Sequence, residues 1–134
     1  QLAKVEDWLV RRNEIWQRYN QALANLPVGL PAPDEPDRRH ARHLYTLSID
    51  EARCGLSRDA FLQRLHEQNI GTGVHYVGVH LQPYYQAQFG FRPEDFPHAT
   101  WLSERTVSLP LSAKLTDEDV EDVIAAVRTA LGRR

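Results

Sequence analysis

The stretch HLYTLSID, residues 43–50, is the most informative part of the chain because its apolar and polar side chains alternate. Its larger apolar members, Tyr45, Leu47 and Ile49, fall on one face of an extended chain, and the small polar members fall on the other. This alternation predicts a half-buried β-strand. Two later stretches that carry β-formers, 73–79 and 106–111, predict a second and a third strand, the last of them ended by Pro110.

Helical patterns surround these strands. Residues 2–25 predict one long helix, since apolar side chains recur in steps of three and four. Ser57 and Thr116 are placed as N-caps of two later helices, and Asp119 completes a capping box with Thr116. A short helix is predicted over 97–105, and Pro83 fits the first turn of another. The stripe of the long helix is formed by Leu2, Val5, Leu9, Trp16, Tyr19, Leu23 and Leu26.

The order of these elements predicts a small open two-layer α/β domain of about three strands with packed helices and a long N-terminal helix. Residues 1–26 form that helix and 43–134 form the small domain. Prolines at 27, 31, 33 and 36 make residues 27–42 a partly extended connector.

Composition excludes several classes of protein. The 134 residues carry a net charge of -2, which disfavours a nucleic-acid-binding protein. The chain has no apolar run of the roughly 20 residues that span a bilayer, and it opens with no signal peptide, so we expect a cytoplasmic protein without a membrane segment. The chain contains no methionine, and we therefore expect it to be a piece of a longer protein.

Histidine is the first candidate for chemistry. His75 and His80 flank the second predicted strand, and His40 and His43 flank the first. The alternative is that all four are hydrogen-bonded structural side chains, which is the common role of a lone histidine. Their spacing matches no ligand pattern for a metal, which needs three or four convergent ligands, so no metal site is predicted.

Other candidates have equally simple structural explanations. Gly71-Thr72-Gly73 could approach a phosphate, but it lacks the rest of a P-loop and fits a helix end. The aromatic cluster Tyr84, Tyr85, Phe89 and Phe91 could stack on a base or pack in the core. Cys54 has no activating neighbour in sequence and is interpreted as structural.

Taken together, five runs resemble one family. They are HARHLY (40–45), DEARCGLSRD (50–59), NIGTGVHY (69–76), HLQPYY (80–85) and SERTVSLPL (103–111). They resemble the C-terminal domain of the pyridoxal-phosphate-dependent nucleotide-sugar aminotransferases of the DegT/DnrJ/EryC1/StrS group. Within that group, DEARCG and IGTG are most similar to the subgroup that forms UDP-4-amino-4-deoxy-L-arabinose for lipid A modification.

The resemblance implies the small domain of the aspartate-aminotransferase fold, with the long helix joining it to a large domain absent from this chain. It implies a homodimeric parent that binds pyridoxal phosphate and transfers an amino group between glutamate or 2-oxoglutarate and a 4-keto nucleotide sugar. It places substrate contacts at His75, Tyr76, His80 and Tyr84, with Tyr85 beside them. It places the Schiff-base lysine and most contacts to the cofactor phosphate in the absent large domain, so no catalytic residue is expected in this chain and the cofactor-binding residues stay unassigned.

Two expectations concern the chain by itself. Its only lysines, Lys4 and Lys114, fall in an exposed first turn and a polar loop, so we expect no Schiff-base binding of pyridoxal phosphate and no activity. We expect the first helix to leave an apolar stripe uncovered, with self-association as the result. The alternative to an enzyme fragment is a free-standing binding or regulatory module of the same fold.

Overall fold

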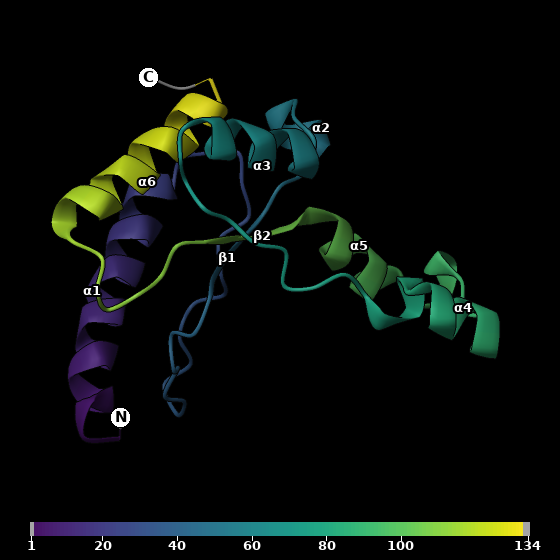
Figure 1. The fold of residues 1–134 in the computed structure, drawn as a ribbon, viewed down its shortest axis with the longest axis horizontal. Helices are drawn as coiled ribbons and strands as arrows, with labels where there is room; N and C mark the ends of the chain where they lie inside the picture. Colours follow the sequence, from purple (N-terminus) through teal and green to yellow (C-terminus); the bar gives the residue numbers. More distant parts are fainter. Residues whose placement is uncertain (1, 133–134) are drawn as a thin grey trace.

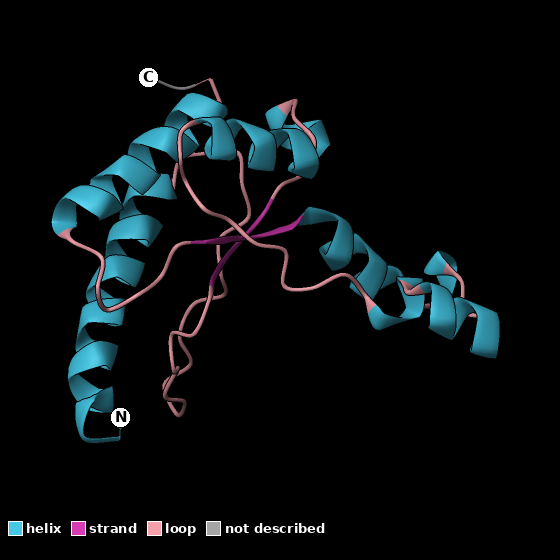
Figure 2. Ribbon diagram, viewed as in Figure 1, coloured by secondary structure: helices cyan, strands magenta, loops and turns pink. Residues whose placement is uncertain are grey.

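The computed structural model describes residues 2–132, so the outermost residues of the predicted ranges 1–26 and 43–134 lie outside the described part. A two-stranded antiparallel sheet crosses its middle (Figure 2). The strands are β1 (Tyr45–Ser48) and β2 (Thr106–Leu109), paired with Tyr45 opposite Leu109 and Ser48 opposite Thr106. The predicted small α/β domain with packed helices and a long N-terminal helix is confirmed, with a smaller sheet than expected.

The helical elements follow the chain in this order: η1 (Leu2–Lys4), α1 (Val5–Leu23), α2 (Glu51–Cys54), α3 (Arg58–Glu67), η2 (Val79–Leu81), α4 (Pro83–Phe89), η3 (Pro93–Asp95), α5 (Pro97–Arg105) and α6 (Asp117–Ala130). Helix α6 lies along the second half of α1 and beside α3 (Figure 1). We call residues 2–75 and 106–132 the body, and residues 76–105, which project away from it, the arm.

The body holds the whole apolar core. Val120, Val123 and Val127 lie on one face of α6 and meet Phe61 and Leu65 of α3, all of them buried. The second half of α1 adds Ile15, Trp16, Tyr19 and Leu23, and the sheet adds Tyr45, Leu47, Val107 and Leu109. The predicted caps are confirmed: the backbone N–H of Ala60 donates to Ser57 Oγ at 3.2 Å, and that of Asp119 donates to Thr116 Oγ1 at 3.1 Å.

The apolar stripe of α1 is covered in one half only. Trp16 is 4% exposed, because Arg42 of the connector and Tyr45 of β1 pack against its ring. Leu2, by contrast, is 88% exposed and Val5 41%. The expectation of an open stripe therefore holds for the N-terminal turns and is wrong at Trp16. A protein surface rarely leaves such side chains uncovered without a partner.

The predicted connector lies against the body. Gly29 exchanges two backbone hydrogen bonds with Ser48 at the outer edge of β1. Two residues on, Pro31 has no N–H to continue the ladder, which ends there. Arg42 then anchors the end of the connector, since its Nε donates to Asn13 Oδ1 at 2.7 Å and its guanidinium carbon lies 4.4 Å from the centre of the Trp16 ring.

The second predicted strand, 73–79, is wrong. Gly73 alone pairs with β2, exchanging backbone hydrogen bonds with Ser108 at 2.8 and 3.2 Å. Beyond it the chain turns to follow α5, where the N–H of Gly78 donates to the Ser103 hydroxyl at 2.8 Å in place of a strand partner. At Gly78 a side-chain hydroxyl thus takes a backbone donor that a ladder would have used.

Candidate functional site

The segment from Gly71 to Leu81 carries the residues that the resemblance marked. It leaves α3 through Asn69, whose positive φ of 60° ends the helix, and touches β2 at Gly73. It then carries His75 and Tyr76 to the junction of body and arm. The predicted site residues therefore begin where the chain stops being held by the sheet.

His75 is half-buried and fixed on one side. Its Nδ1 lies 2.8 Å from the Oγ of Ser108, a buried residue of β2. The ring meets Tyr76 edge to face, with 4.8 Å between centroids, and Tyr76 itself is 72% exposed. This arrangement leaves Tyr76 and one edge of His75 available to a molecule or domain outside the chain.

The position of the His75 ring requires a residue without a side chain at position 73. A Cβ built on Gly73 would lie 2.7 Å from Cε1 of the His75 ring, closer than carbon atoms approach. Any other residue would push the imidazole away from Ser108. The glycine explains why the run Gly-Thr-Gly-Val-His matters here without any phosphate at the glycines.

His80 is placed differently. It lies in η2, is 6% exposed, and its Nε2 lies 2.7 Å from Thr100 Oγ1 of α5. A Cβ on Gly78 would lie 2.6 Å from its Cε1, so the geometry around Gly73 and His75 is repeated. In the described structure His80 ties η2 to α5, and the predicted substrate contact at His80 stays a prediction.

Tyr84 stands on α4, 67% exposed, at the end of a row of aromatic rings. Tyr84 meets Tyr85 at 5.5 Å between centroids. The row continues through Phe89, Phe91 and Phe96 to the ring of His80. It joins His80 and Tyr84 into one aromatic surface on the arm, while His75 and Tyr76 form a separate pair at its base.

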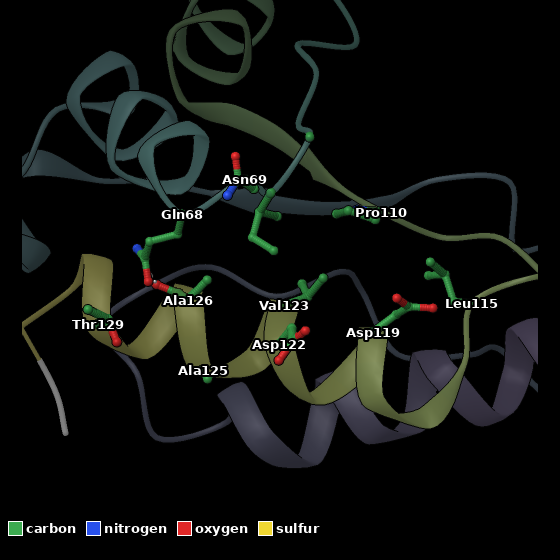
Figure 3. A pocket seen from close by; sticks show the side chains of 12 residues that line it. Gln68, Asn69, Pro110, Leu115, Asp119, Asp122, Val123, Ala125, Ala126 and Thr129 are labelled. Carbon is green, nitrogen blue, oxygen red and sulfur yellow. Dashed lines mark hydrogen bonds between the residues drawn. The ribbon is translucent and has the colours of Figure 1, made fainter.

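A groove of about 570 Å³ lies elsewhere on the described surface. It lies between residues 68–71 and α6 (Figure 3), and none of the predicted site residues lines it. Gln68 reaches across it to the carbonyl of Ala126 at 3.4 Å. At its far end the Asp119 carboxylate accepts from the backbone N–H and the hydroxyl of Thr116, which lowers the pKa of that carboxyl. We therefore base the candidate site on the surface at His75 and give this groove no role.

Both lysines of the chain are exposed. Lys4 is exposed in η1 at the N-terminal end of α1, and Lys114 is exposed in the turn before α6, so neither offers a desolvated amine beside His75.

Among residues 2–132 no three His, Cys, Asp or Glu side chains gather as a metal site. Within the same range no helix has the length and apolar character needed to cross a membrane. Cys54 Sγ lies 3.1 Å from the carbonyl oxygen of Asp50 and 3.2 Å from that of Leu56, so its one hydrogen has an acceptor inside the fold, in keeping with the structural role predicted for it.

Three hydroxyl residues that hold this segment were not among the predicted site residues. Thr100, Ser103 and Ser108 bind His80, Gly78 and His75, respectively. The signal was present as a repeated triplet, Gly-Val-His at 73–75 and again at 78–80. Its hydroxyl partners lie some 20 to 33 residues further along the chain, and only folding brings them near.

Comparisons with known proteins identify the family of the chain. The DegT/DnrJ/EryC1/StrS aminotransferase family matches residues 1–128. The spore coat polysaccharide biosynthesis protein SpsC of Bacillus subtilis (strain 168) is 47% identical over 130 residues, which cover 96% of this chain and 33% of that protein.

Solved structures give the same result. The aminotransferase TlmJ from Streptoalloteichus hindustanus is 31% identical with a TM-score of 0.85, over 98% of this chain and 34% of that one. A sugar aminotransferase from Streptococcus pneumoniae, solved in its PLP form, is 30% identical with a TM-score of 0.88, over 98% and 33%. This chain thus spans about one third of the length of its relatives. With nearly its whole length matched in sequence and in shape, the chain belongs to the DegT/DnrJ/EryC1/StrS aminotransferase family.

Proposed function

We propose that this chain is the C-terminal part of a pyridoxal-phosphate-dependent aminotransferase that transfers an amino group from glutamate to a 4-keto nucleotide sugar. The observation that carries the proposal is the family match over residues 1–128, together with the coverage of only a third of each relative. In this proposal α1 joins the small domain to a preceding large domain, and the parent is a homodimer. Its cytoplasmic location stays a prediction.

The remaining two thirds of the parent supply the cofactor site, since neither lysine here is suited to it. Pyridoxal phosphate, when bound there, provides the electron sink for amino transfer. The part of this chain is substrate binding: Tyr76 offers an exposed phenol, and His75 offers one ring nitrogen held in place through the other. Both groups can hydrogen-bond the oxygens of a sugar or a phosphate.

The identity of the sugar substrate is the more specific part of the proposal. The runs DEARCG and IGTG favour the aminoarabinose branch of lipid A modification, whereas the Bacillus relative is named for spore coat polysaccharide. An assay of the full-length protein with glutamate and either a UDP-4-keto-pentose or a UDP-4-keto-6-deoxyhexose separates the two. A higher kcat/KM on the pentose supports the aminoarabinose branch, and a higher value on the hexose contradicts it.

The role of His75 is tested in the same full-length protein. We expect His75→Ala to reduce kcat/KM for the nucleotide sugar about tenfold or more, the lower end of what positioned acid–base or binding groups contribute. His98→Ala is the matched control, because His98 is exposed on α5 and belongs to none of the runs that carry the resemblance. Unchanged turnover in His75→Ala would remove His75 from the site.

A free-standing binding module of the same fold is the second candidate. It predicts that the coding sequence upstream holds no lysine-bearing domain, and that the chain by itself binds a nucleotide sugar. Titration of the 134-residue chain with a UDP-sugar by calorimetry tests this. Tight binding by the chain alone would favour the module, whereas we expect binding only in the full-length protein.

A further inference from the structure

The two Gly-Val-His triplets form the same local structure twice. At 73–75 and at 78–80 the histidine ring folds back over the glycine two residues earlier, where a Cβ would collide with it. Each ring then meets a hydroxyl from the stretch that contains α5 and β2: Ser108 for His75 and Thr100 for His80. The hydroxyls decide which ring nitrogen carries the proton, because a hydroxyl has a single hydrogen to donate.

The proton position at His80 follows from the second contact of Thr100. The Thr100 hydroxyl donates its hydrogen to the carbonyl of Pro93 at 2.8 Å, since a carbonyl only accepts. Towards His80 it can therefore only accept, at 2.7 Å from Nε2. The proton of neutral His80 is therefore on Nε2. The His80 N–H and the Thr100 hydroxyl both have their hydrogen-bond partners inside the arm, so neither is free for a ligand through this contact.

At His75 the hydroxyl meets the other ring nitrogen, Nδ1, and the direction of the hydrogen bond is reversed. Ser108 is 4% exposed, and among the described residues its hydroxyl contacts only Nδ1 of His75. If Nδ1 carried the proton, the hydroxyl hydrogen of Ser108 would be buried without an acceptor, which is costly. The hydroxyl therefore donates to Nδ1, and the ring proton is on Nε2.

We propose that Ser108 is a positioning residue whose hydroxyl fixes His75 as an Nε2–H hydrogen-bond donor, directed at an oxygen of the nucleotide sugar. This inference rests on the proposed function and adds the direction of the hydrogen bond. A neutral His75 with its proton on Nε2 donates there and does not accept. Ser108 suits the role because it is fixed itself: its backbone N–H and carbonyl are both bonded to Gly73.

The first test reads the proton directly, without any assay of activity. The full-length protein is labelled with ¹⁵N in its histidine rings, the His75 resonances are assigned by their loss in His75→Gln, and spectra are recorded at alkaline pH, where imidazole is neutral. The informative pair is S108T and S108V, two β-branched side chains of nearly equal shape of which only threonine has a hydroxyl. We expect the Nε2–H tautomer alone in the wild type and in S108T, and a measurable share of Nδ1–H in S108V.

An Nδ1–H tautomer in the wild type would overturn the proposal, and so would identical tautomers in S108T and S108V. The wild-type spectrum is informative even if S108V does not fold. Because this measurement needs no substrate, it stays valid if the parent aminates no nucleotide sugar, a result that would contradict the proposed function alone.

The second test measures steady-state kinetics with the nucleotide sugar. We expect S108V to lower kcat/KM about tenfold, the scale of one well-made hydrogen bond, and S108T to recover most of that loss. Ser112→Val is the control: Ser112 is exposed, and its hydroxyl caps a turn at Lys114 away from the site. Equal kcat/KM in S108V and S108T would show that the hydroxyl of Ser108 has no positioning role.

Discussion

The body and the arm of this molecule are built in opposite ways. Every buried apolar side chain of the described core lies in the body. In the arm only His80 and Ser103 are buried, and both are polar. Large apolar side chains of the arm, such as Val79, Phe89 and Leu102, are more than half exposed. The body is thus stabilised by burial of its own side chains, and the arm by hydrogen bonds and local turns.

The N-terminal ends of the helices also differ between the body and the arm. Asp50, Ser57 and Thr116 cap three helices of the body with side-chain oxygens. Helices α4 and α5 of the arm begin at prolines and have no side-chain cap. The arm therefore holds a shape without a core of its own, which suits a segment that packs on the rest of a longer protein.

The largest effect is expected from removing a core leucine. Leu65→Ala should lower the free energy of unfolding of the 134-residue chain by about 3 kcal/mol, because Leu65 is fully buried between α3 and α6. Leu102→Ala is the matched change in the arm, and at 53% exposure it should cost about 0.5 kcal/mol. Urea unfolding measures both. Equal losses would show that the arm shares the stability of the body.

Gly78→Ala tests how the arm is held. Its backbone conformation, with φ of -54°, is open to alanine, but the new methyl group would collide with the buried ring of His80. We expect a loss of about 2 kcal/mol, as for overpacking elsewhere, and faster amide exchange over η2 and α4. Gly71→Ala, with no atom within 4 Å of the added Cβ, should be neutral or slightly stabilising. Unchanged exchange in Gly78→Ala would mean that His80 does not fasten the arm.

Loss of one body cap should have a smaller effect. Ser57→Ala removes the acceptor for the N–H of Ala60 and should cost about 1 kcal/mol of the free energy of unfolding. Ser57→Asp keeps an acceptor and should recover most of the loss. Thermal unfolding of the three proteins checks this, and equal midpoints for alanine and aspartate would exclude a capping role.

Lowering the pH should decrease the stability of the body through two carboxyl groups in the first turn of α6. The pKa of Asp119 is lowered by hydrogen bonds from Thr116, and that of Asp117 by Arg11 and then Arg18. A carboxyl with a lowered folded-state pKa stabilises above its unfolded value of 3.8, and that contribution is lost as pH falls through the folded-state pKa. The free energy of unfolding should therefore fall below about pH 4, and less steeply in Asp119→Asn. The same slope in both proteins would contradict this assignment.

Local patterns in the amino-acid sequence account for much of the body. The alternation in 43–50 predicts β1, Ser57 and Thr116 mark the starts of α3 and α6, and Pro110 follows the end of β2. The range 97–105 matches α5. These features depend on residues a few positions apart, so the sequence alone carries them.

Contacts between distant parts of the chain set the remaining features. Residues 73–79 have the composition of a strand, yet only Gly73 pairs, because the hydroxyls of Ser103 and Ser108 bind the chain and turn it along the arm. Trp16 is covered by Arg42 and Tyr45, which lie 26 and 29 positions later in the chain, while Leu2 on the same stripe is 88% exposed.

Helices α1, α3, α5 and α6 and strands β1 and β2 could be predicted from short stretches of sequence, and His75 and His80 stay candidates to be tested. The orientation of the His75 ring could not be predicted in this way. Which of its nitrogens is held and which is offered depends on the single hydroxyl hydrogen of Ser108, a residue 33 positions away that only the folded chain brings beside it.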